Sequence, residues 1–305
     1  MAEPLVWVTG SGGFLAEVVA RHVQATWPAA RVIGVGRRAL AGERRVEALA
    51  LDLNDAAALH AALDRLTPDI VFHAAGRVVG TEWPILYRDN VAATLALLDG
   101  LVVQAPQARV VVAGSAAECG MIGEAMLPVR EEHALHPVSP YGVSKAWQTL
   151  GARSYAFRGL HVVVGRIFNI VGRGTPPSTS LGTFAAQLRD IAAGRREPVM
   201  HVGNLDTRRD FLDVEDVASA LCALAATSSA GELYNICSGR SVGIGEALEL
   251  LIRLSGCAVR VEIEAARLRP GDVPEAYGSP AKIAECCGWT PRVALSESLS
   301  AMLSD

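Results

Sequence analysis

Lysine is almost absent from this sequence. Lys145 and Lys282 are the two lysines among 305 residues, and arginine supplies the rest of the positive charge, within a net charge of −4 at pH 7. The sequence has no basic stripe that would suit a nucleic acid backbone, so we exclude nucleic acid as a partner. Arginine is also the better donor to phosphate groups, because its planar guanidinium can bind two oxygens at once.

Several other signals are missing. No hydrophobic run approaches the length of a membrane span, so we expect no membrane partner. The N-terminal residues show no basic segment and no cleavage site, which favours a cytoplasmic protein. The cysteines form no CxxC pair and no metal-like spacing with histidine, which predicts reduced, mostly buried thiols and no metal site. They stand at positions 119, 222, 237, 257, 286 and 287.

What the sequence does contain is a regular alternation of two patterns. Short apolar runs bounded by turn residues predict buried parallel strands at 5–8, 31–35, 46–51, 69–75, 109–114 and 161–167. Helical patterns between most of them predict helices at 14–26, 55–65, 84–103 and 140–158. This alternation is typical of an α/β fold with a Rossmann-type, doubly wound parallel sheet.

The regular alternation of strand and helix patterns ends after the sixth predicted strand. Residues 172–182 read as a loop rich in proline, glycine and serine, and shorter elements follow, including one at 231–239. We therefore expect a first domain over residues 1–168 and a smaller α/β substrate-binding lobe over most of 169–305. Part of 205–240 is expected to return to the first domain.

The segment TGSGGFLA, residues 9–16, ends the first strand and opens the first helix. Gly10 permits a tight turn, and Gly13 lets the backbone approach a pyrophosphate at the helix N-terminus. Ala16 is the small residue that allows close packing of helix on strand. The spacing is G-x-x-G-x-x-A rather than G-x-G-x-x-G. The alternative is a simple glycine-rich turn, but the position between strand and helix favours a dinucleotide site.

The end of the second strand indicates which dinucleotide is bound. An acidic residue there would hold the ribose 2′-hydroxyl of NAD, whereas an arginine accommodates the 2′-phosphate of NADP. Arg37 and Arg38 follow Gly36, which favours NADP(H) over NAD(H); the alternative is a solvated basic turn. Asp52, after the third strand, could accept a hydrogen bond from the adenine amino group or could cap the next helix.

Tyr141 and Lys145 lie four residues apart in the segment SPYGVSK. Ser139 and Pro140 predict a helix start, as a capping hydroxyl and a first-turn proline, so the tyrosine and lysine share one helix face. A nearby ammonium and the helix N-terminus should lower the tyrosine pKa, which suits proton exchange with a ketone or alcohol. Ser115, at the end of the fifth strand, could donate to the same substrate oxygen. The alternative is an exposed helical pair and an ordinary strand-end serine.

The order of these motifs resembles the extended short-chain dehydrogenase/reductases that act on nucleotide sugars. The segments VGNLDTRRDFLDVEDV, YNICSG and LRPGDVPEAYGSPAKI most resemble the reductases of GDP-4-keto-6-deoxy-D-mannose within that family. The resemblance covers nearly the whole chain, through TGSGGFLA, HAAG (73–76), DNVAATLALLD, GSAAECG, YGVSK, GRIFNIVGRG, RRDFLDVEDVA, GELYNICSG and RLRPGDVP…GWTP.

The resemblance implies an NAD(P)-dependent oxidoreductase with Ser115, Tyr141 and Lys145 as its catalytic triad. It implies a nucleotide-diphosphate sugar as substrate, bound by Ser115, Asn169, Arg209 and Arg269. It also implies a homodimer in which helices 84–103 and 140–158 pack as a four-helix bundle. With the residues already discussed, the expected cofactor contacts are Gly10, Gly13, Phe14, Leu15, Arg37, Arg38, Asp52, Leu53, Ala74, Ala75, Gly76, Asn90, Tyr141, Lys145 and Ile167.

The residues after Ser115 bear on the reaction. Sugar 4,6-dehydratases of this family carry an acid pair or a glutamate in the two following positions, because elimination of water needs a base and an acid. Here these are Ala116 and Ala117, which cannot move protons. Glu118 comes one position later, although a local bulge could bring it in.

The sequence therefore favours NADPH-dependent reduction of the C4 ketone of a nucleotide-linked 4-keto-6-deoxysugar, with GDP-4-keto-6-deoxy-D-mannose to GDP-D-rhamnose as the best match. The alternatives are an NAD-dependent nucleotide-sugar 4-epimerase and a non-catalytic NADP-binding sensor. Cys119 replaces a tyrosine usual in the family, and is either a reactive thiol or a small packed side chain.

Overall fold

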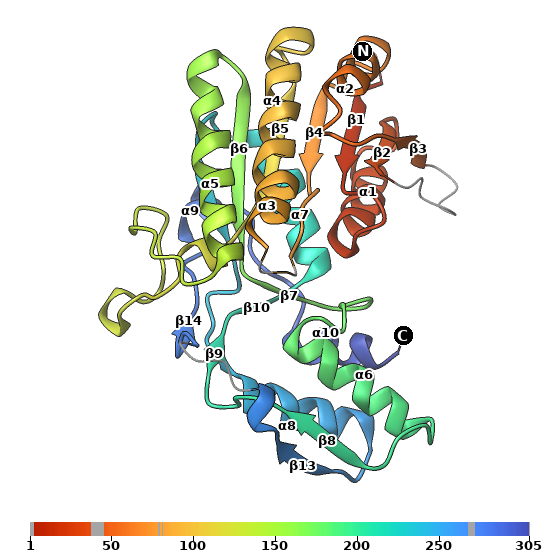
Figure 1. The fold of residues 1–305 in the computed structure, drawn as a ribbon, viewed down its shortest axis with the longest axis vertical. Coiled ribbons are helices and arrows are strands. Elements are labelled where there is room, and N and C mark those ends of the chain that lie inside the picture. The colour runs from red at the N-terminus through yellow and green to blue at the C-terminus, as the bar shows by residue number, and fades with distance from the viewer. Residues whose placement is uncertain (1–2, 38–45, 79, 81, 268–271, 305) are drawn as a thin grey trace.

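The computed structural model describes residues 3–37, 46–78, 80, 82–267 and 272–304. A seven-stranded parallel sheet organises the larger part of the molecule, in the order β11-β6-β5-β4-β1-β2-β3 (Figure 1). The chain reverses its order between β1 and β4, which is the switch point where open α/β sheets bind ligands. These strands are β1 (Leu5–Thr9), β2 (Arg31–Gly36), β3 (Val46–Ala50), β4 (Ile70–His73), β5 (Arg109–Ser115), β6 (His161–Ile167) and β11 (Leu233–Ile236).

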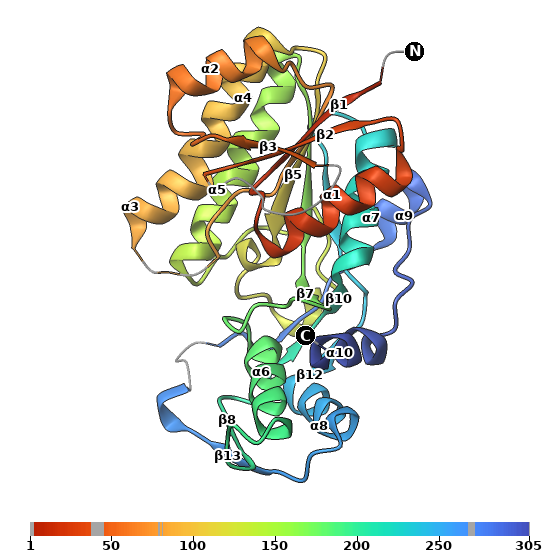
Figure 2. The same cartoon turned by 90° about the vertical axis from the view of Figure 1, so that its right-hand side faces the viewer.

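Helices cover both faces of this sheet (Figure 2). One face carries α1 (Phe14–Thr26), α7 (Val214–Thr227) and α9 (Ala281–Cys287), and the other carries α2 (Ala56–Arg65), α4 (Ala93–Gln104) and α5 (Pro140–Ser154). Along β1, Val6 and Val8 join the first of these cores and Trp7 joins the second. Burial on both faces explains why the strands read as continuous apolar runs, and the predicted fold class is confirmed.

The predicted helix 84–103 is built from three consecutive segments. They are α3 (Trp83–Leu86), the π-helical turn η1 (Tyr87–Ala92) and α4. The predicted helix 140–158 comprises α5 and a 3-10 turn, η4 (Tyr155–Arg158). Its start is as predicted, because Ser139 Oγ accepts from the N–H of Gly142 at 3.0 Å and Pro140 occupies the first turn.

Of the two alternatives for Asp52, the cap of the next helix is wrong. Asp55 is the N-cap of α2 and accepts from the N–H of Ala58 at 3.0 Å. Asp52 instead accepts from the N–H of Asn54 in the preceding turn, at 3.0 Å. The sequence offers two aspartates within one turn, and the backbone path selects the second.

A second lobe lies beyond the carboxyl ends of the parallel strands (Figure 1). Its core joins α6 (Ser180–Ala192), α8 (Ile244–Ser255) and α10 (Leu295–Leu303) to β8 (Val199–Val202), which pairs with β13 (Arg260–Ile263). From this half of the sequence, α7 and β11 return to the large sheet. The smaller elements are β7 (Asn169–Val171), β9 (Arg208–Arg209), β10 (Phe211–Asp213), β12 (Val242–Gly243), β14 (Glu275–Ala276), η2 (Ala116–Glu118), η3 (Glu124–Met126) and η5 (Ala265–Arg267).

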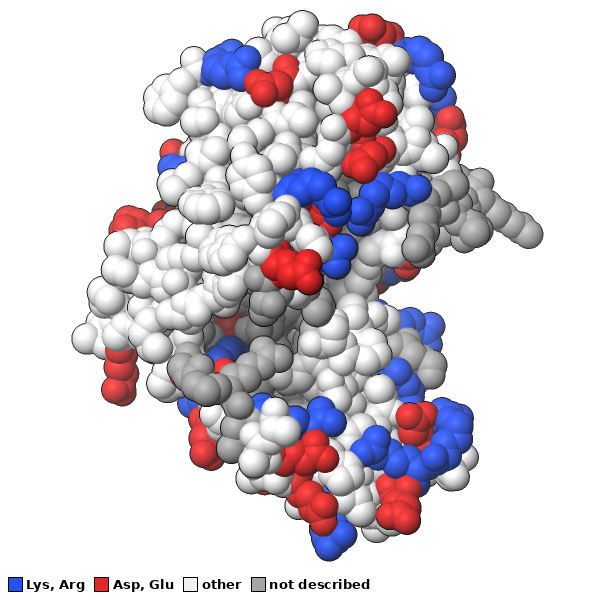
Figure 3. Space-filling model, viewed as in Figure 1, with Lys and Arg blue, Asp and Glu red and all other residues white. Residues whose placement is uncertain are grey.

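The surface is mixed in charge. Lysine and arginine alternate with aspartate and glutamate over the face drawn in Figure 3, and the described part of that face shows no continuous basic stripe. Within the described ranges, no helix combines the length and the apolar character that a membrane span requires.

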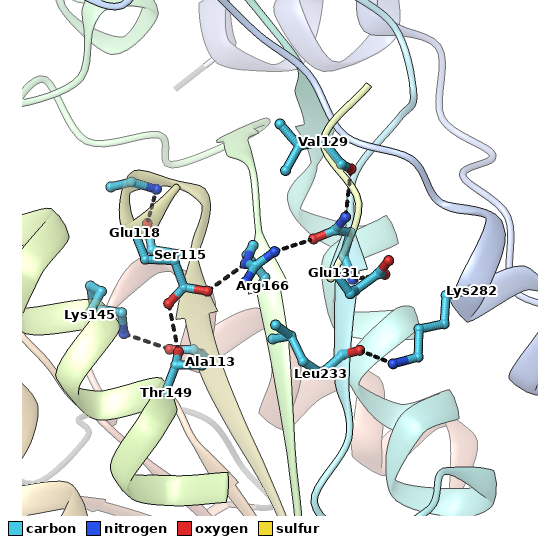
Figure 4. A network of polar contacts seen from close by, with 12 residues as sticks. Ala113, Ser115, Glu118, Val129, Glu131, Lys145, Thr149, Arg166, Leu233 and Lys282 are labelled. Carbon is cyan, nitrogen blue, oxygen red and sulfur yellow. Dashed lines mark hydrogen bonds and ion pairs between the residues drawn. The ribbon is translucent and has the colours of Figure 1, made fainter. Parts of the chain in front are cut away.

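A buried ion pair and its hydrogen bonds connect η2, β6, α5 and β11 (Figure 4). Glu118, at the end of η2, pairs with Arg166 of β6, and neither side chain is more than 1% exposed. The other carboxylate oxygen of Glu118 accepts from Thr149 Oγ1 of α5 at 2.7 Å. Arg166 also donates to Asn235 Oδ1 of β11 at 3.4 Å. Because buried charges are costly unless they are paired and hydrogen-bonded, this cluster fixes the four elements relative to one another.

We expect Glu118→Gln to lower the free energy of unfolding by about 3–5 kcal/mol, because the buried charge of Arg166 then lacks its countercharge. Urea unfolding followed by tryptophan fluorescence measures the change. The double variant E118Q/R166M removes both charges and should recover much of the loss. An equal or greater loss in the double variant would show that packing, and not charge, accounts for the effect.

Candidate active site

Ser115, Tyr141 and Lys145 meet at the carboxyl end of β5. Ser115 is the last residue of that strand, and its Oγ accepts from the N–H of Ala117 at 3.2 Å, which caps η2. The phenol of Tyr141, in the first turn of α5, lies near enough to Ser115 for that side chain to act on its pKa. One turn further along, Lys145 Nζ donates to the carbonyl oxygen of Ala113 at 2.6 Å (Figure 4). The structure therefore brings the three predicted residues together.

The electrostatics of Tyr141 differ from the expectation. Burial raises the pKa of Tyr141; the side chain of Ser115 acts to lower it and the charge of Glu118 to raise it. The predicted fall in the pKa is wrong, because the ammonium of Lys145 is directed toward Ala113 and Gln148 instead of the phenol. The phenol of Tyr141 therefore keeps its proton at neutral pH.

Lys145 is the buried cation of the site. Burial lowers the pKa of Lys145 to about 8, although the charge of Glu118 acts in the opposite direction. Its Nζ donates to Gln148 Oε1 as well as to Ala113. The sequence analysis did not single out Gln148, and its position three residues after the lysine is the signal that could have found it.

The three residues after Ser115 supply no free acid or base next to its hydroxyl. Ala116 and Ala117 form the start of η2, and Glu118 forms its end. Arg166 and Thr149 occupy the two carboxylate oxygens of Glu118, which is fully buried. The bulge considered for Glu118 is not present, and its carboxylate belongs to the buried cluster.

The glycine turn after β1 is shaped to receive a dinucleotide. Gly10 has φ +79°, and a Cβ there would lie 2.8 Å from the backbone of Ala74 and Ala75, so glycine is required for this close approach. Gly13 is the N-cap of α1 and makes no side-chain cap, which leaves the N-terminal N–H groups of the helix for a ligand. Ala16 is buried against the sheet, as the spacing predicted.

Ser11 is a residue that the sequence analysis missed. Its hydroxyl is buried, and it has no hydrogen-bond partner among the described residues. It lies beside Gly36 at the end of β2, where a Cβ would come within 2.8 Å of Ser11 Oγ. Arg37 follows and is exposed, and its charge acts on Asp89. The unpaired hydroxyl of Ser11, beside a glycine and an arginine, fits the adenosine ribose of a dinucleotide. Arg38, the second arginine expected to contact the cofactor, lies outside the described residues.

Asn90 supports the loop after β4. Its Oδ1 accepts from the N–H of Arg77 at 2.6 Å, and its Nδ2 donates to the carbonyl of Arg77 at 3.1 Å and to Ser144 Oγ at 2.9 Å. The side chain is fully buried. Asn90 thus ties the segment 74–77 to α5, and any effect on a cofactor passes through that loop.

The remaining cofactor candidates line the same edge. Leu53 and Ile167 are buried beyond β3 and at the end of β6, and Phe14 and Leu15 are partly buried in the first turn of α1. Gly76 lies against Asn90, since a Cβ there would come within 2.9 Å of its Oδ1.

Two of the three predicted phosphate ligands are close to each other in the second lobe. Asn169 of β7 is exposed, and its Nδ2 donates to the carbonyl of Asp210 at 2.9 Å. Arg209 immediately precedes that residue; burial lowers its pKa and the charge of Asp272 acts to raise it. Its neighbour Arg208 pairs with two glutamates, whereas Arg209 Nη1 donates to a backbone carbonyl at 2.7 Å. Arg269 lies outside the described residues.

Cys119 is a packed side chain. It is 4% exposed, and burial raises the pKa of its thiol to about 11. The interpretation as a reactive thiol is therefore wrong, because reactivity requires the thiolate. Cys119 belongs to a small apolar cluster with Ile122, Val129, Phe168 and Cys237.

The chain was compared with known proteins. The model of the NAD dependent epimerase/dehydratase family matches residues 6–237. GDP-6-deoxy-D-mannose reductase of Pseudomonas aeruginosa is 35% identical over 78% of this chain and 80% of its own length. UDP-glucose 4-epimerase of Azospirillum brasilense is 32% identical over 95% of this chain and 88% of its own length. The structure of RMD from P. aeruginosa complexed with NADPH superposes with a TM-score of 0.83 and 29% identity, covering 99% and 97% of the two chains. The chain therefore belongs to the NAD dependent epimerase/dehydratase family and is an NAD(P)-dependent enzyme of the extended short-chain dehydrogenase/reductase type.

Proposed function

We propose that this enzyme uses NADPH to reduce the C4 ketone of a nucleotide-linked 4-keto-6-deoxysugar, converting GDP-4-keto-6-deoxy-D-mannose to GDP-D-rhamnose. The observation that carries the proposal is the position of Tyr141 beside Ser115 at the carboxyl edge of the sheet, where burial raises the pKa of the phenol and so keeps its proton in place. Ketone reduction needs one hydride and one proton, and a protonated phenol supplies the proton. The 35% identity to GDP-6-deoxy-D-mannose reductase supports the choice of sugar.

The chain's own groups account for the proton and for the developing charge. NADPH, when bound, supplies the hydride for the new C4–H bond. Tyr141 donates its phenolic proton to the carbonyl oxygen, and Ser115 donates a hydrogen bond to the same oxygen as negative charge develops. Lys145 lies one turn along the same helix, where its ammonium donates to the carbonyl oxygen of Ala113 and to Gln148 and keeps one N–H for a ligand. The product carries a hydroxyl in place of the ketone.

The substrate's diphosphate is assigned to Arg209 and Asn169. Arg209 is partly desolvated and is held by a backbone carbonyl, so an anionic ligand would supply the countercharge that Glu246 and Glu275 supply to Arg208. Asn169 of β7 donates to the carbonyl of Asp210, the residue that follows Arg209.

A nucleotide-sugar 4-epimerase is a second candidate, supported by the 32% identity to UDP-glucose 4-epimerase. Such an enzyme begins by taking a proton from a hydroxyl, so Tyr141 would have to start as the phenolate. The raised pKa of Tyr141 therefore favours the reductase. Dehydration is less well supported, because Ala116 and Ala117 carry no acid and Glu118 is held in an ion pair.

The first prediction concerns turnover. The protein should oxidise NADPH with a 4-keto-6-deoxysugar linked to GDP in preference to UDP, CDP or dTDP, with the product identified by NMR. Tyr141→Phe should lower kcat by about 10²-fold or more, because the proton donor is lost, while NADPH affinity is unchanged. Tyr155→Phe is the control, since that hydroxyl lies on η4 and contacts the carbonyl of Leu95 at 3.3 Å.

Two outcomes would contradict the proposal. A near-normal rate in Tyr141→Phe removes this phenol from the mechanism. Purified protein that holds stoichiometric NAD and does not oxidise added NADPH is an epimerase.

The preference for NADPH over NADH is assigned to Arg37, with Ser11 beside it. The exposed guanidinium of Arg37 follows directly on Gly36, and the buried hydroxyl of Ser11 faces the same glycine. An arginine at this strand end can pair with a 2′-phosphate, which NADH lacks. The similarity to a structure solved with NADPH supports this assignment.

The second prediction follows from that pairing. Arg37→Ser should weaken NADPH binding by about 10-fold or more and leave NADH binding nearly unchanged, because a charge-assisted hydrogen bond is lost. Titration of nicotinamide fluorescence measures both affinities. Arg31→Ser is the matched control, because Arg31 begins the same strand and pairs with Glu47 at the opposite edge of the sheet. Equal weakening of the two cofactors by Arg37→Ser would contradict the assignment.

We also infer a homodimer through the face formed by α3, η1, α5 and η4. Five large apolar side chains on the elements around α5 are exposed, and the surface over this helix is largely without charge in Figure 3. Trp147 lies at the centre, with ring centroids 5.9 Å from Trp83 and 6.2 Å from Tyr87. Single exposed apolar residues are normal, but several large ones on neighbouring elements, three of them in ring contact, support an interface. The group consists of Trp83, Tyr87, Trp147, Leu150 and Phe157.

The third prediction tests this surface. Light scattering should give twice the mass of one chain for the unmodified protein, and Trp147→Glu should give the mass of one chain, because a charge at the centre of the group opposes burial. Leu254→Glu is the control, since Leu254 is 41% exposed on α8 in the second lobe. A Trp147→Glu variant that stays dimeric would place the interface elsewhere.

A further inference from the structure

A row of buried polar side chains crosses the core from β1 to the catalytic helix. Thr9 Oγ1 lies 2.8 Å from His73 Nδ1, and His73 Nε2 lies 2.8 Å from Thr94 Oγ1. Gln148 Nε2 donates to Thr94 Oγ1 at 2.8 Å, and Gln148 Oε1 accepts from Lys145 Nζ. The first four are at most 1% exposed, and Lys145 is 6% exposed.

The direction of each hydrogen bond in this row is fixed. Thr94 has one hydroxyl proton, and it goes to the carbonyl oxygen of Asn90 at 2.7 Å. The Thr94 oxygen must therefore accept from both of its other neighbours, His73 and Gln148. Burial and the charge of Lys145 lower the pKa of His73 to about 3, so its ring is neutral and carries one N–H. That N–H is on Nε2, and Nδ1 accepts from Thr9.

The same logic fixes the amide of Gln148. Because Thr94 can only accept, the NH₂ group of Gln148 must face Thr94 and its carbonyl oxygen must face Lys145. An amide in this position could otherwise rotate and offer an N–H to the ammonium. Lys145 then has two fixed acceptors, Gln148 Oε1 and the carbonyl of Ala113, and one N–H is left for a ligand.

We propose that Gln148 is a positioning residue that holds the ammonium of Lys145 at the carboxyl end of β5, with its amide locked by Thr94 and His73. The inference rests on the role of Lys145 in the function proposed above. An ordinary helical pair at this spacing is loose and solvated, whereas this one is buried and its donors and acceptors are assigned through the core.

The proposal has an electrostatic consequence. Three groups act on Lys145 besides the backbone of β5: Gln148 from α5, Glu118 from η2 and neutral His73 from β4. A carbonyl oxygen on the ammonium stabilises its charged form. Removing that oxygen should lower the pKa of Lys145, and replacing it with a carboxylate should raise the pKa.

The scarcity of lysine makes a direct measurement possible. Protein labelled with [ε-¹³C]lysine should give two lysine signals, from Lys145 and Lys282, and Lys282→Arg assigns them. The titration midpoint of Lys145 should fall by about one pH unit in Gln148→Leu and rise in Gln148→Glu. A purely structural role would lower thermal stability without moving the midpoint in opposite directions. An unchanged midpoint in both variants overturns the proposal.

Thr94 supplies an independent test of the lock. Thr94→Val removes the acceptor that orients the amide, so the midpoint of Lys145 should fall as it does in Gln148→Leu, while Thr94→Ser keeps the hydroxyl and should restore it. If Gln148→Leu does not fold, Gln148→Glu and Thr94→Val carry the test. A shift in the Gln148 variants with none in Thr94→Val would show that the amide is not locked.

The measurement separates this inference from the proposed function, because it needs no substrate. If the midpoints move as expected but no nucleotide sugar is turned over, the positioning role stands and the proposed function fails. If turnover is observed and the midpoints do not move, the proposed function stands and the positioning role of Gln148 fails. Where both hold, the alkaline limb of the kcat–pH profile should follow the NMR midpoint in each variant.

Discussion

Glu118 and Arg166 place a carboxylate and a guanidinium in the interior directly behind the strand end that carries Ser115. Neither charge can be left alone there, so the four segments that supply this pair and its hydrogen bonds must keep a single relative position. Those segments are the turn after β5, strand β6, helix α5 and strand β11. The same constraint removes Glu118 from the chemistry, since a carboxylate that holds the core together has no oxygen to offer a substrate. The carboxylate of Glu118 thus has a structural role, and the proton of the proposed reaction is left to Tyr141.

Helix α5 is anchored twice, through neighbouring residues that point in different directions. Thr149 reaches Glu118 toward β6, and Gln148 reaches Thr94 toward α4. Consecutive helical residues are about 100° apart, so these two bonds prevent rotation of the helix about its axis. Tyr141 and Lys145 lie on the same helix, so they are held in position without a further loss of conformational entropy. The proposed ligands of the nucleotide diphosphate come from short strands in the other lobe, which suits a site that aligns two molecules against one fixed helix.

Much of this architecture could be predicted, because periodicity and turn chemistry are local. The first six strands, the start of α5 at Ser139 and the small residue at Ala16 all follow from nearby residues. The failures are non-local. The pKa of Tyr141 depends on how deeply the phenol is buried and on where the ammonium of Lys145 points. The four-residue spacing of the two side chains predicts neither. The partners of Glu118 lie 31 and 48 residues away. The sequence around Ser11 did not mark it as a candidate, because a hydroxyl that is buried without a hydrogen-bond partner can be recognised only in the structure.

The near absence of lysine has a consequence for the surface. Arginine stays protonated at every pH at which a protein is folded, and the second lysine, Lys282, is held by Glu232 and by the carbonyl of Leu233 above the ring of Tyr234. The positive charge on the exterior is therefore constant between neutral and mildly alkaline solution. Among side chains, reagents that attack primary amines meet one accessible lysine, Lys282, because Lys145 is buried, so coupling to a solid support through lysine would leave α5 untouched.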